Sequence, residues 1–394
     1  MRIETFELER WMTTYETEVE FDIAESGIYP LSVQDLLDLT PEGERAALLD
    51  ELLTTRLGYS EARGSRALRE ALAATYTATS PDEILVTTGA IEANFVLFNV
   101  LLHPGDHVIA VHPAYQQLYS VPRAIGCEVD LWRLTPERGF QFDLAELERL
   151  LRPNTRLVII NTPHNPTGAM LEPQELAQIY RWVEQRDGWL LADEAYRWLD
   201  LPGSTPLAPP ARDLGSRAIS VGTFSKPFGL PGLRIGWYAA PPEIVAAGWA
   251  MRDFITLSPG KLNDLLALYA LRRRDDIAAR TRSIVEHNLA TARAWFADHA
   301  DIVRWREPRG GLLALLTYGL DMPSLPLANR LAEEYSVMLA PGSAFGLEYH
   351  LRLGIGQRPD VFEAGLERFS ACLSDLRASG IGPRAGWDQG RLDG

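Results

Sequence analysis

The stretch VGTFSKPFGLPGLRIG, residues 221–236, joins an apolar run to a glycine- and proline-rich loop that holds a single lysine, Lys226. A lysine that forms an imine needs a fixed backbone and a depressed pKa, because only the neutral amine attacks a carbonyl. Thr223 and Ser225 offer hydroxyls and Arg234 offers a fork of donors, which together suit a phosphate dianion. The plain alternative for this stretch alone is a surface lysine in a loop.

Lysine is rare in this chain, since only Lys226 and Lys261 occur among 38 basic residues. Codon bias toward arginine explains the rarity, and it leaves only these two candidates for chemistry that needs an amine side chain. The net charge of −15 argues against a nucleic-acid partner. Apolar runs are too short to span a membrane, and Cys127 and Cys372 lie too far apart for a metal or redox motif. We therefore expect a cytoplasmic protein with two free thiols, no membrane partner and no metal site.

Apolar runs alternate with helix-like segments between about Pro81 and Ala240. Runs of this kind are typical of strands buried on both faces, in a mostly parallel sheet covered by helices. Ligands bind at the carboxyl ends of such strands. The strands are expected at Glu83–Val86, His107–Val111, Glu128–Trp132, Leu157–Ile160, Trp189–Ala192, Ile219–Val221 and Ile235–Ala239, and helices at Ile91–Leu102 and Glu172–Gln185.

The pattern changes after Pro259, where helices to about Phe296 precede two strands, Gly311–Tyr318 and Tyr349–Ile355, and a helix, Val361–Ser374. At 394 residues the chain is long enough for about two domains. We expect an N-terminal arm with part of the small domain at 1–42, a large domain at 43–285, a small α+β domain at 286–378 and a disordered tail at 379–394.

Polar residues follow several of the expected strands. Asn165 lies in the turn NTPHNPTG, residues 161–168, and an amide there can reach a phenolate-type oxygen, although such turns are common. Asp193 ends a buried strand, which is costly without a cation such as a pyridinium N–H or an arginine. Tyr196 lies three residues further on and can donate its hydroxyl to the same ligand.

Two further positions suit anions. Gly89 and Ala90 begin a helix after a strand, where free backbone N–H groups bind phosphate. Arg352 lies within an apolar strand and requires a carboxylate, from a substrate or from a structural ion pair.

In their order along the chain these residues resemble the aminotransferase superfamily of fold-type-I pyridoxal 5′-phosphate (PLP) enzymes, from about residue 25 to 375. The resemblance implies an α/β fold with a mostly parallel seven-stranded sheet between helices and a small α+β domain. It implies that Lys226 carries PLP as a Schiff base and moves protons, that Asp193 pairs with the pyridinium nitrogen, and that Asn165 and Tyr196 bond the ring oxygen. Tyr115, in the run HPAY, is similar to the aromatic residue that stacks on the ring.

The resemblance also assigns the remaining partners of cofactor and substrate. Tyr59, in GYSEARG, matches a tyrosine that reaches the phosphate of a neighbouring subunit, which implies a homodimer with shared active sites. Arg352 matches the arginine that binds the α-carboxylate of an amino acid substrate, near Gly27 and Asn165. The phosphate is expected among Gly89, Ala90, Thr223, Ser225 and Arg234.

The segment FDIAESGIYP, residues 21–30, departs from the commoner pattern because it carries Asp22 and Glu25 before Gly27. Glu16, Glu18 and Glu20 lie just before it, and together they form either a solvated acidic arm or a partner for a cationic substrate side chain, with a guanidinium as the natural bidentate ligand. With LERW at residues 8–11, the segment resembles capreomycidine synthases and related hydroxyarginine cyclases.

That second resemblance implies elimination and ring closure of a hydroxyarginine to a cyclic guanidino amino acid. The alternatives are an ordinary aminotransferase with a 2-keto acid acceptor, and an arginine oxidase-type reaction. A PLP-binding transcription regulator would need a winged DNA-binding domain, for which the chain has no room.

Overall fold

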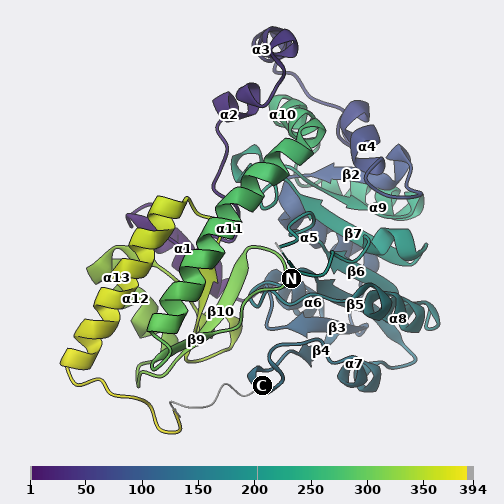
Figure 1. Ribbon diagram of the computed structural model, residues 1–394. Helices are drawn as coiled ribbons and strands as arrows, with labels where there is room; N and C mark the ends of the chain where they lie inside the picture. The colour runs from purple at the N-terminus through teal and green to yellow at the C-terminus, as the bar shows by residue number, and fades with distance from the viewer. Residues whose placement is uncertain (1, 202, 388–394) are drawn as a thin grey trace.

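A mixed sheet forms the centre of the larger part of the computed structural model, which describes residues 2–201 and 203–387 (Figure 1). The sheet has seven strands in the order β2-β8-β7-β6-β5-β3-β4, and β8 alone runs antiparallel to its neighbours. The expected α/β class with a mostly parallel sheet is therefore confirmed. The strands are β2 (Ile84–Thr87), β3 (His107–His112), β4 (Glu128–Arg133), β5 (Thr155–Asn161), β6 (Trp189–Asp193), β7 (Ala218–Thr223) and β8 (Gly236–Ala239).

Helices pack against this sheet through two apolar cores. The larger core joins the central strands to α5, α6 and α8, and a second core joins β2 and β8 to α4 and α10. The helices are α4 (Arg66–Ala73), α5 (Gly89–Leu101), α6 (Gln117–Ile125), α7 (Leu144–Leu150), α8 (Pro173–Glu184), α9 (Pro242–Arg252) and α10 (Lys261–Arg272). None of the described helices is long and apolar enough to cross a membrane.

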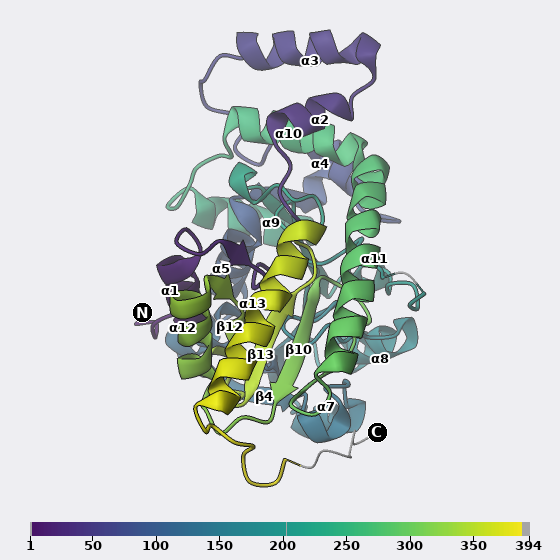
Figure 2. The ribbon, with the colours of Figure 1, turned by 60° about the vertical axis from the view of Figure 1, so that its left-hand side comes forward.

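A smaller antiparallel sheet, in the order β12-β13-β10-β9, lies beside the large one and is covered by α11 and α13 (Figure 2). The N-terminal arm joins this part, because β1 pairs in parallel with β11 and α1 packs into the small core. The elements are α1 (Glu7–Tyr15), β1 (Phe21–Asp22), α11 (Arg274–Asp298), β9 (Val303–Trp305), β10 (Leu313–Tyr318), α12 (Ser324–Tyr335), β11 (Val337–Met338), β12 (Ala340–Pro341), β13 (His350–Gly354) and α13 (Pro359–Ala378).

Two helices stand apart from both sheets. Figure 2 shows α3 (Glu42–Thr54) at the top of the molecule, with α2 (Val33–Asp38) below it near α10. The 25-residue helix α11 links the two parts, since Ile277 packs in the large-domain core and Val285 in the small-domain core. The expected boundary after residue 285 falls inside this continuous helix, and the domain limits stay predictions.

The expected disorder of the tail is wrong for its first part. Residues 379–387 pack on the small domain: the Asp321 N–H donates to Gly382 O at 3.1 Å, and Trp387 Nε1 donates to Asp301 O at 2.8 Å. The indole of Trp387 provides an apolar surface, and the prediction of disorder considered only the glycines and charges of the tail. Residues 388–394 lie outside the described part of the chain.

Candidate active site

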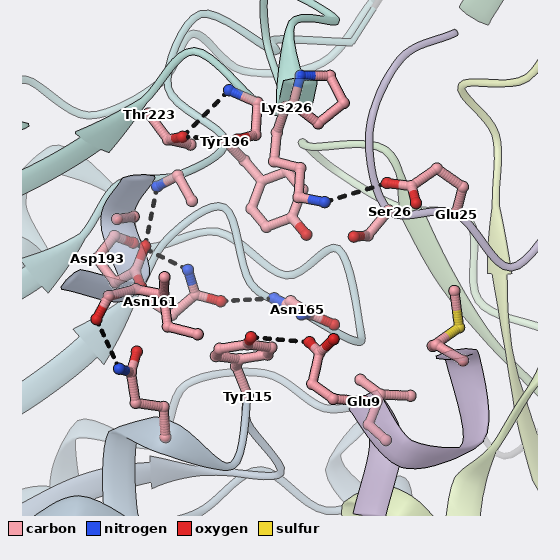
Figure 3. Close-up of a pocket in the computed structure, with 18 of the residues that line it drawn as sticks. Glu9, Glu25, Ser26, Tyr115, Asn161, Asn165, Asp193, Tyr196, Thr223 and Lys226 are labelled. Atoms are coloured by element: carbon pink, nitrogen blue, oxygen red, sulfur yellow. Dashed lines mark hydrogen bonds and ion pairs between the residues drawn. The ribbon is translucent and has the colours of Figure 1, made fainter. Parts of the chain in front are cut away.

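The carboxyl ends of β5, β6 and β7 open into a cavity of about 420 Å³, closed on the other side by the N-terminal arm and β13 (Figure 3). Cavities of this size are typical of small-molecule sites. The structure brings most of the predicted residues together there: Glu25, Ala90, Tyr115, Asn165, Asp193, Tyr196, Thr223, Ser225, Lys226, Arg234 and Arg352.

Lys226 follows β7 and reaches into this cavity. Its Nζ lies 3.1 Å from Glu25 Oε1, which also accepts the Gly27 N–H at 2.8 Å. Burial lowers the pKa of Lys226, but the charge and hydrogen bond of Glu25 outweigh burial and hold that pKa above its usual value. The expectation of a depressed pKa was therefore wrong for this structure, because it did not include a carboxylate far away in sequence. A Cβ added to Gly27 would meet Lys226 Cδ at 3.5 Å, so Gly27 lies beside the lysine, and its expected place at the substrate stays a prediction.

Asp193 ends β6 at the base of the cavity and is 6% exposed. Asn94 Nδ2 donates to its Oδ2 at 2.9 Å, and the Ala195 N–H donates to its Oδ1 at 3.0 Å. Burial raises the pKa of Asp193, and no cation of the described residues forms an ion pair with it. A buried carboxylate with neutral donors and a remaining lone pair fits the protonated nitrogen of a pyridine ring.

The start of α5 faces the loop that follows β7. Gly89 has φ +78°, and a Cβ there would lie 2.8 Å from Arg234 Nη2, so only glycine lets the guanidinium approach this closely. The Ser225 N–H donates to Thr223 Oγ1 at 3.1 Å, and the two hydroxyl oxygens are 3.0 Å apart. Hydroxyls, a guanidinium and the N–H groups of a helix start are the donor set that binds a phosphate.

Tyrosines lie on two sides of the cavity. The Tyr115 hydroxyl donates a hydrogen bond to Glu9 Oε1 at 2.8 Å, and the ring centroids of Tyr115 and Phe6 are 4.7 Å apart. Tyr196 is buried and hydrogen-bonded to the Ser26 side chain, and burial raises its pKa although the charge of Lys226 opposes this. The expected stacking of Tyr115 on the ring and the bond from Tyr196 to the ring oxygen stay predictions.

Arg352 comes from β13 and is 2% exposed. Its Nη2 donates to Ala24 O at 2.8 Å and its Nη1 to Asn165 Oδ1 at 3.4 Å. Within residues 2–201 and 203–387 it forms no ion pair, and its buried Nε has no hydrogen-bond acceptor. The sequence left open whether Arg352 binds a substrate carboxylate or forms a structural ion pair. A buried guanidinium that contacts no carboxylate of the protein favours the substrate carboxylate.

Tyr59 lies away from this cavity and is 85% exposed, beside residues 256–263. Its expected place at a neighbouring subunit's phosphate, and the homodimer, stay predictions. Asp22 does not line the cavity either. Its Oδ1 instead accepts the N–H groups of Ala24 and Glu25 at 2.9 and 3.0 Å. Desolvation, followed by the charge of Glu25, raises the pKa of Asp22 to about 6.

Sequence reasoning gave no site role to three residues, Asn94, Asn161 and Glu9, and left open whether Glu16 faces the site. Asn94 orients Asp193, and Asn161 donates to Asp193 O at 2.9 Å while its Oδ1 accepts the Asn165 N–H at 2.7 Å. Glu9 bonds Tyr115, and Glu16 lines the cavity, whereas Glu18 and Glu20 do not. The spacing of Glu9 and Glu16, two helical turns apart, is the signal that could have placed both on one face of a helix.

Comparisons with known proteins agree with this geometry. The model of the family "Aminotransferase class I and II" matches residues 26–369. Capreomycidine synthase of Streptomyces vinaceus is 34% identical over 364 residues, covering 92% of each chain. The crystal structure of a PLP-dependent aminotransferase from Streptococcus suis is 32% identical with a TM-score of 0.90 over 98% of this chain and 100% of that one. The PLP-dependent cyclase OrfR is 33% identical with a TM-score of 0.86, over 95% and 98%.

The family match extends over the strand ends that supply Asp193 and Lys226, and the donor set around α5 fits the phosphate of its cofactor. The chain belongs to the class I and II aminotransferase family, and it is an enzyme that uses pyridoxal phosphate as its cofactor.

Proposed function

We propose that this enzyme removes water from an arginine hydroxylated at its β-carbon and closes the guanidino group into a ring. The observation that carries the proposal is that two carboxylates of the α1 segment, Glu9 and Glu16, line the same cavity as the buried Arg352. An arginine binds an α-carboxylate and acids bind a guanidinium, so the cavity offers complementary partners for both ends of an arginine derivative. The similarity to capreomycidine synthase and to the cyclase OrfR supports the same substrate class.

The residues divide the work between binding and proton transfer. PLP, when bound, supplies the electron sink that makes the α-proton of an amino acid acidic. Arg352 and Asn165 hold the α-carboxylate, and Glu9 and Glu16 hold the guanidinium. Lys226 Nζ removes the α-proton, and the hydroxyl leaves the β-carbon with one proton as water. A guanidine nitrogen then bonds to the β-carbon, and a proton returns to the α-carbon, so the product is the substrate less one water.

An ordinary aminotransferase is the second candidate, because the similarity to the Streptococcus suis aminotransferase extends over the whole of that chain. Transamination would use the same Lys226 and Asp193, but it would keep the β-hydroxyl and pass the amino group to a keto acid acceptor. Oxidation is a third outcome and would consume oxygen.

Incubation of the PLP-loaded enzyme with β-hydroxyarginine, followed by mass spectrometry, separates these functions. The proposal predicts a product lighter by one water without any keto acid and under nitrogen. Turnover that requires a 2-keto acid and yields its amino acid would instead show a transaminase, and turnover that requires oxygen would show an oxidase.

Two neighbouring acids provide a matched pair of variants for the substrate side chain. Both side chains are exposed, but Glu16→Gln removes a carboxylate that lines the cavity, whereas Glu18→Gln removes one that does not. We expect Glu16→Gln to raise KM about tenfold, as for the loss of about 1.4 kcal/mol of charge-assisted bonding, and Glu18→Gln to leave KM unchanged. Equal values of KM for both variants would contradict guanidinium binding by Glu16.

A further inference from the structure

A second proton-handling group lies beside Lys226. Glu25 Oε1 is 3.1 Å from Nζ and is fixed by the Gly27 N–H at 2.8 Å. The segment before it is held as well, because the carboxylate of Asp22 accepts the N–H groups of Ala24 and Glu25. Glu25 lines the cavity, and its carboxylate points at the amine of Lys226 (Figure 3).

Loss of water requires two proton transfers at adjacent carbons. The α-carbon gives up a proton, and the hydroxyl on the β-carbon must receive one, because hydroxide is a poor leaving group. Transamination needs no acid at the β-carbon, so a lone lysine suffices for it. A carboxyl group within hydrogen-bonding distance of the lysine supplies the additional acid that dehydration needs.

We propose that Glu25 is a catalytic residue that takes the α-proton from Lys226 and delivers it to the departing β-hydroxyl. This inference rests on the proposed dehydration of a hydroxyarginine. The proton moves from the α-carbon to Nζ, then to Oε1 and then to the hydroxyl oxygen. The electron pair of the α-carbon–hydrogen bond forms the double bond between the two carbons, and the pair of the carbon–oxygen bond leaves with water.

The charges around Glu25 suit this role. The positive charge of Lys226, opposed by burial, lowers the pKa of Glu25 to about 2, and Arg352 lowers it further. When Lys226 is neutral its contribution disappears, and burial, which raises the pKa of Glu25, is then opposed only by Arg352 and the Gly27 N–H. The pKa of Glu25 therefore rises when Lys226 loses its charge.

The test compares Glu25→Gln with Glu18→Gln, an exposed acid outside the cavity, in the PLP-loaded enzyme. Exchange of the arginine α-proton in deuterium oxide, followed by NMR, reports Lys226 alone, and dehydration of β-hydroxyarginine reports the added acid. We expect Glu25→Gln to keep exchange within about threefold and to lose dehydration by about a hundredfold or more. Glu18→Gln should keep both rates.

A second measurement does not depend on turnover. Lys226 and Lys261 are the only lysines, so acetic anhydride labelling of the apoenzyme over a range of pH, read by peptide mass, titrates Lys226 against an internal reference. Glu25→Gln should shift the Lys226 titration at least one unit to lower pH, and an unshifted titration would overturn the inference. Dehydration that persists in Glu25→Gln would overturn the inference alone, whereas a wild-type enzyme that forms no dehydrated product would overturn the proposed function and the inference with it.

Discussion

Replacement of Asp193 by asparagine is expected to separate the stability of the apoenzyme from its hold on PLP. Asp193 is 6% exposed, accepts hydrogen bonds from Asn94 and the Ala195 N–H, and has no ion pair in the part of the chain that the structure describes. Burial raises its pKa, so the folded apoenzyme binds this proton more tightly than the unfolded chain does. Stability therefore falls as pH rises above the ordinary value of about 4, and the variant removes that loss.

The bound cofactor reverses the sign of this effect. A pyridinium beside Asp193 would make a buried ion pair, and removing one partner of such a pair costs about 3–5 kcal/mol. At 1.4 kcal/mol for each factor of ten, this corresponds to a loss of roughly two to three and a half orders of magnitude in PLP affinity and turnover. Asn94 keeps an acceptor in the variant, because the asparagine side chain retains one oxygen.

Thermal unfolding at pH 8 with and without saturating PLP, together with kcat, measures both effects. The Tm of apo Asp193→Asn should be no lower than that of the wild type, and the rise on adding PLP should be smaller. Glu194→Gln is the control for PLP stabilisation and kcat only, which it should leave unchanged, because Glu194 Oε1 accepts from the Ala211 N–H and Ser220 Oγ, each at 2.7 Å, and Glu194 does not line the cavity. A kcat within tenfold of the wild type, or an undiminished PLP stabilisation, would refute the assignment of Asp193.

Three further predictions follow from the same contacts. Arg352→Gln removes a buried guanidinium that has no ion-pair partner among the described residues and lies beside Asn165. The loss of about 2 kcal/mol or more of binding free energy should raise KM for the amino acid about thirtyfold or more in steady-state assays, and an unchanged KM would contradict carboxylate binding. Gly89→Ala would place a Cβ 2.8 Å from Arg234 Nη2 at a residue whose φ is +78°. The affinity for PLP should fall at least about tenfold in a fluorescence titration, and an affinity equal to that of the wild type would count against the phosphate site. Burial raises the pKa of Glu194 to about 7, so this group should lower the stability of the apoenzyme by about 3 kcal/mol from pH 4.5 to 7. Urea unfolding should show that Glu194→Gln removes this part of the slope and leaves the part that comes from Asp22 and Asp193, and a slope equal to that of the wild type would contradict the prediction.

The sheet and the meeting of Asp193 and Lys226 in one cavity could be predicted because strand ends are visible in the sequence. Apolar runs marked the seven strands, and Asp193 and Lys226 stand where β6 ends and just after β7. Residues at the carboxyl ends of neighbouring strands meet at one edge of a sheet, so their convergence follows from the pattern. The short strands β1, β11 and β12 carry too few residues for any periodic signal.

The environment of Lys226 could not be predicted in the same way. Its partner Glu25 lies 201 residues away in sequence. Glu25 belongs to an N-terminal arm whose acidic residues are equally typical of a solvent-exposed segment. The pKa of a lysine depends on which carboxylate the fold places next to it, and no local pattern contains that information. The tail shows the same limit, because Trp387 packs through contacts with a distant loop at Asp301.

The central claim is that PLP is bound covalently through Lys226. Sodium borohydride reduction of the purified holoenzyme, followed by peptide mass mapping, tests it directly, because the chain offers only one other lysine, Lys261. The account predicts a stable pyridoxyl adduct on the peptide that contains Lys226, and none in Lys226→Ala. An adduct on Lys261 alone, or turnover that persists in Lys226→Ala, would contradict it.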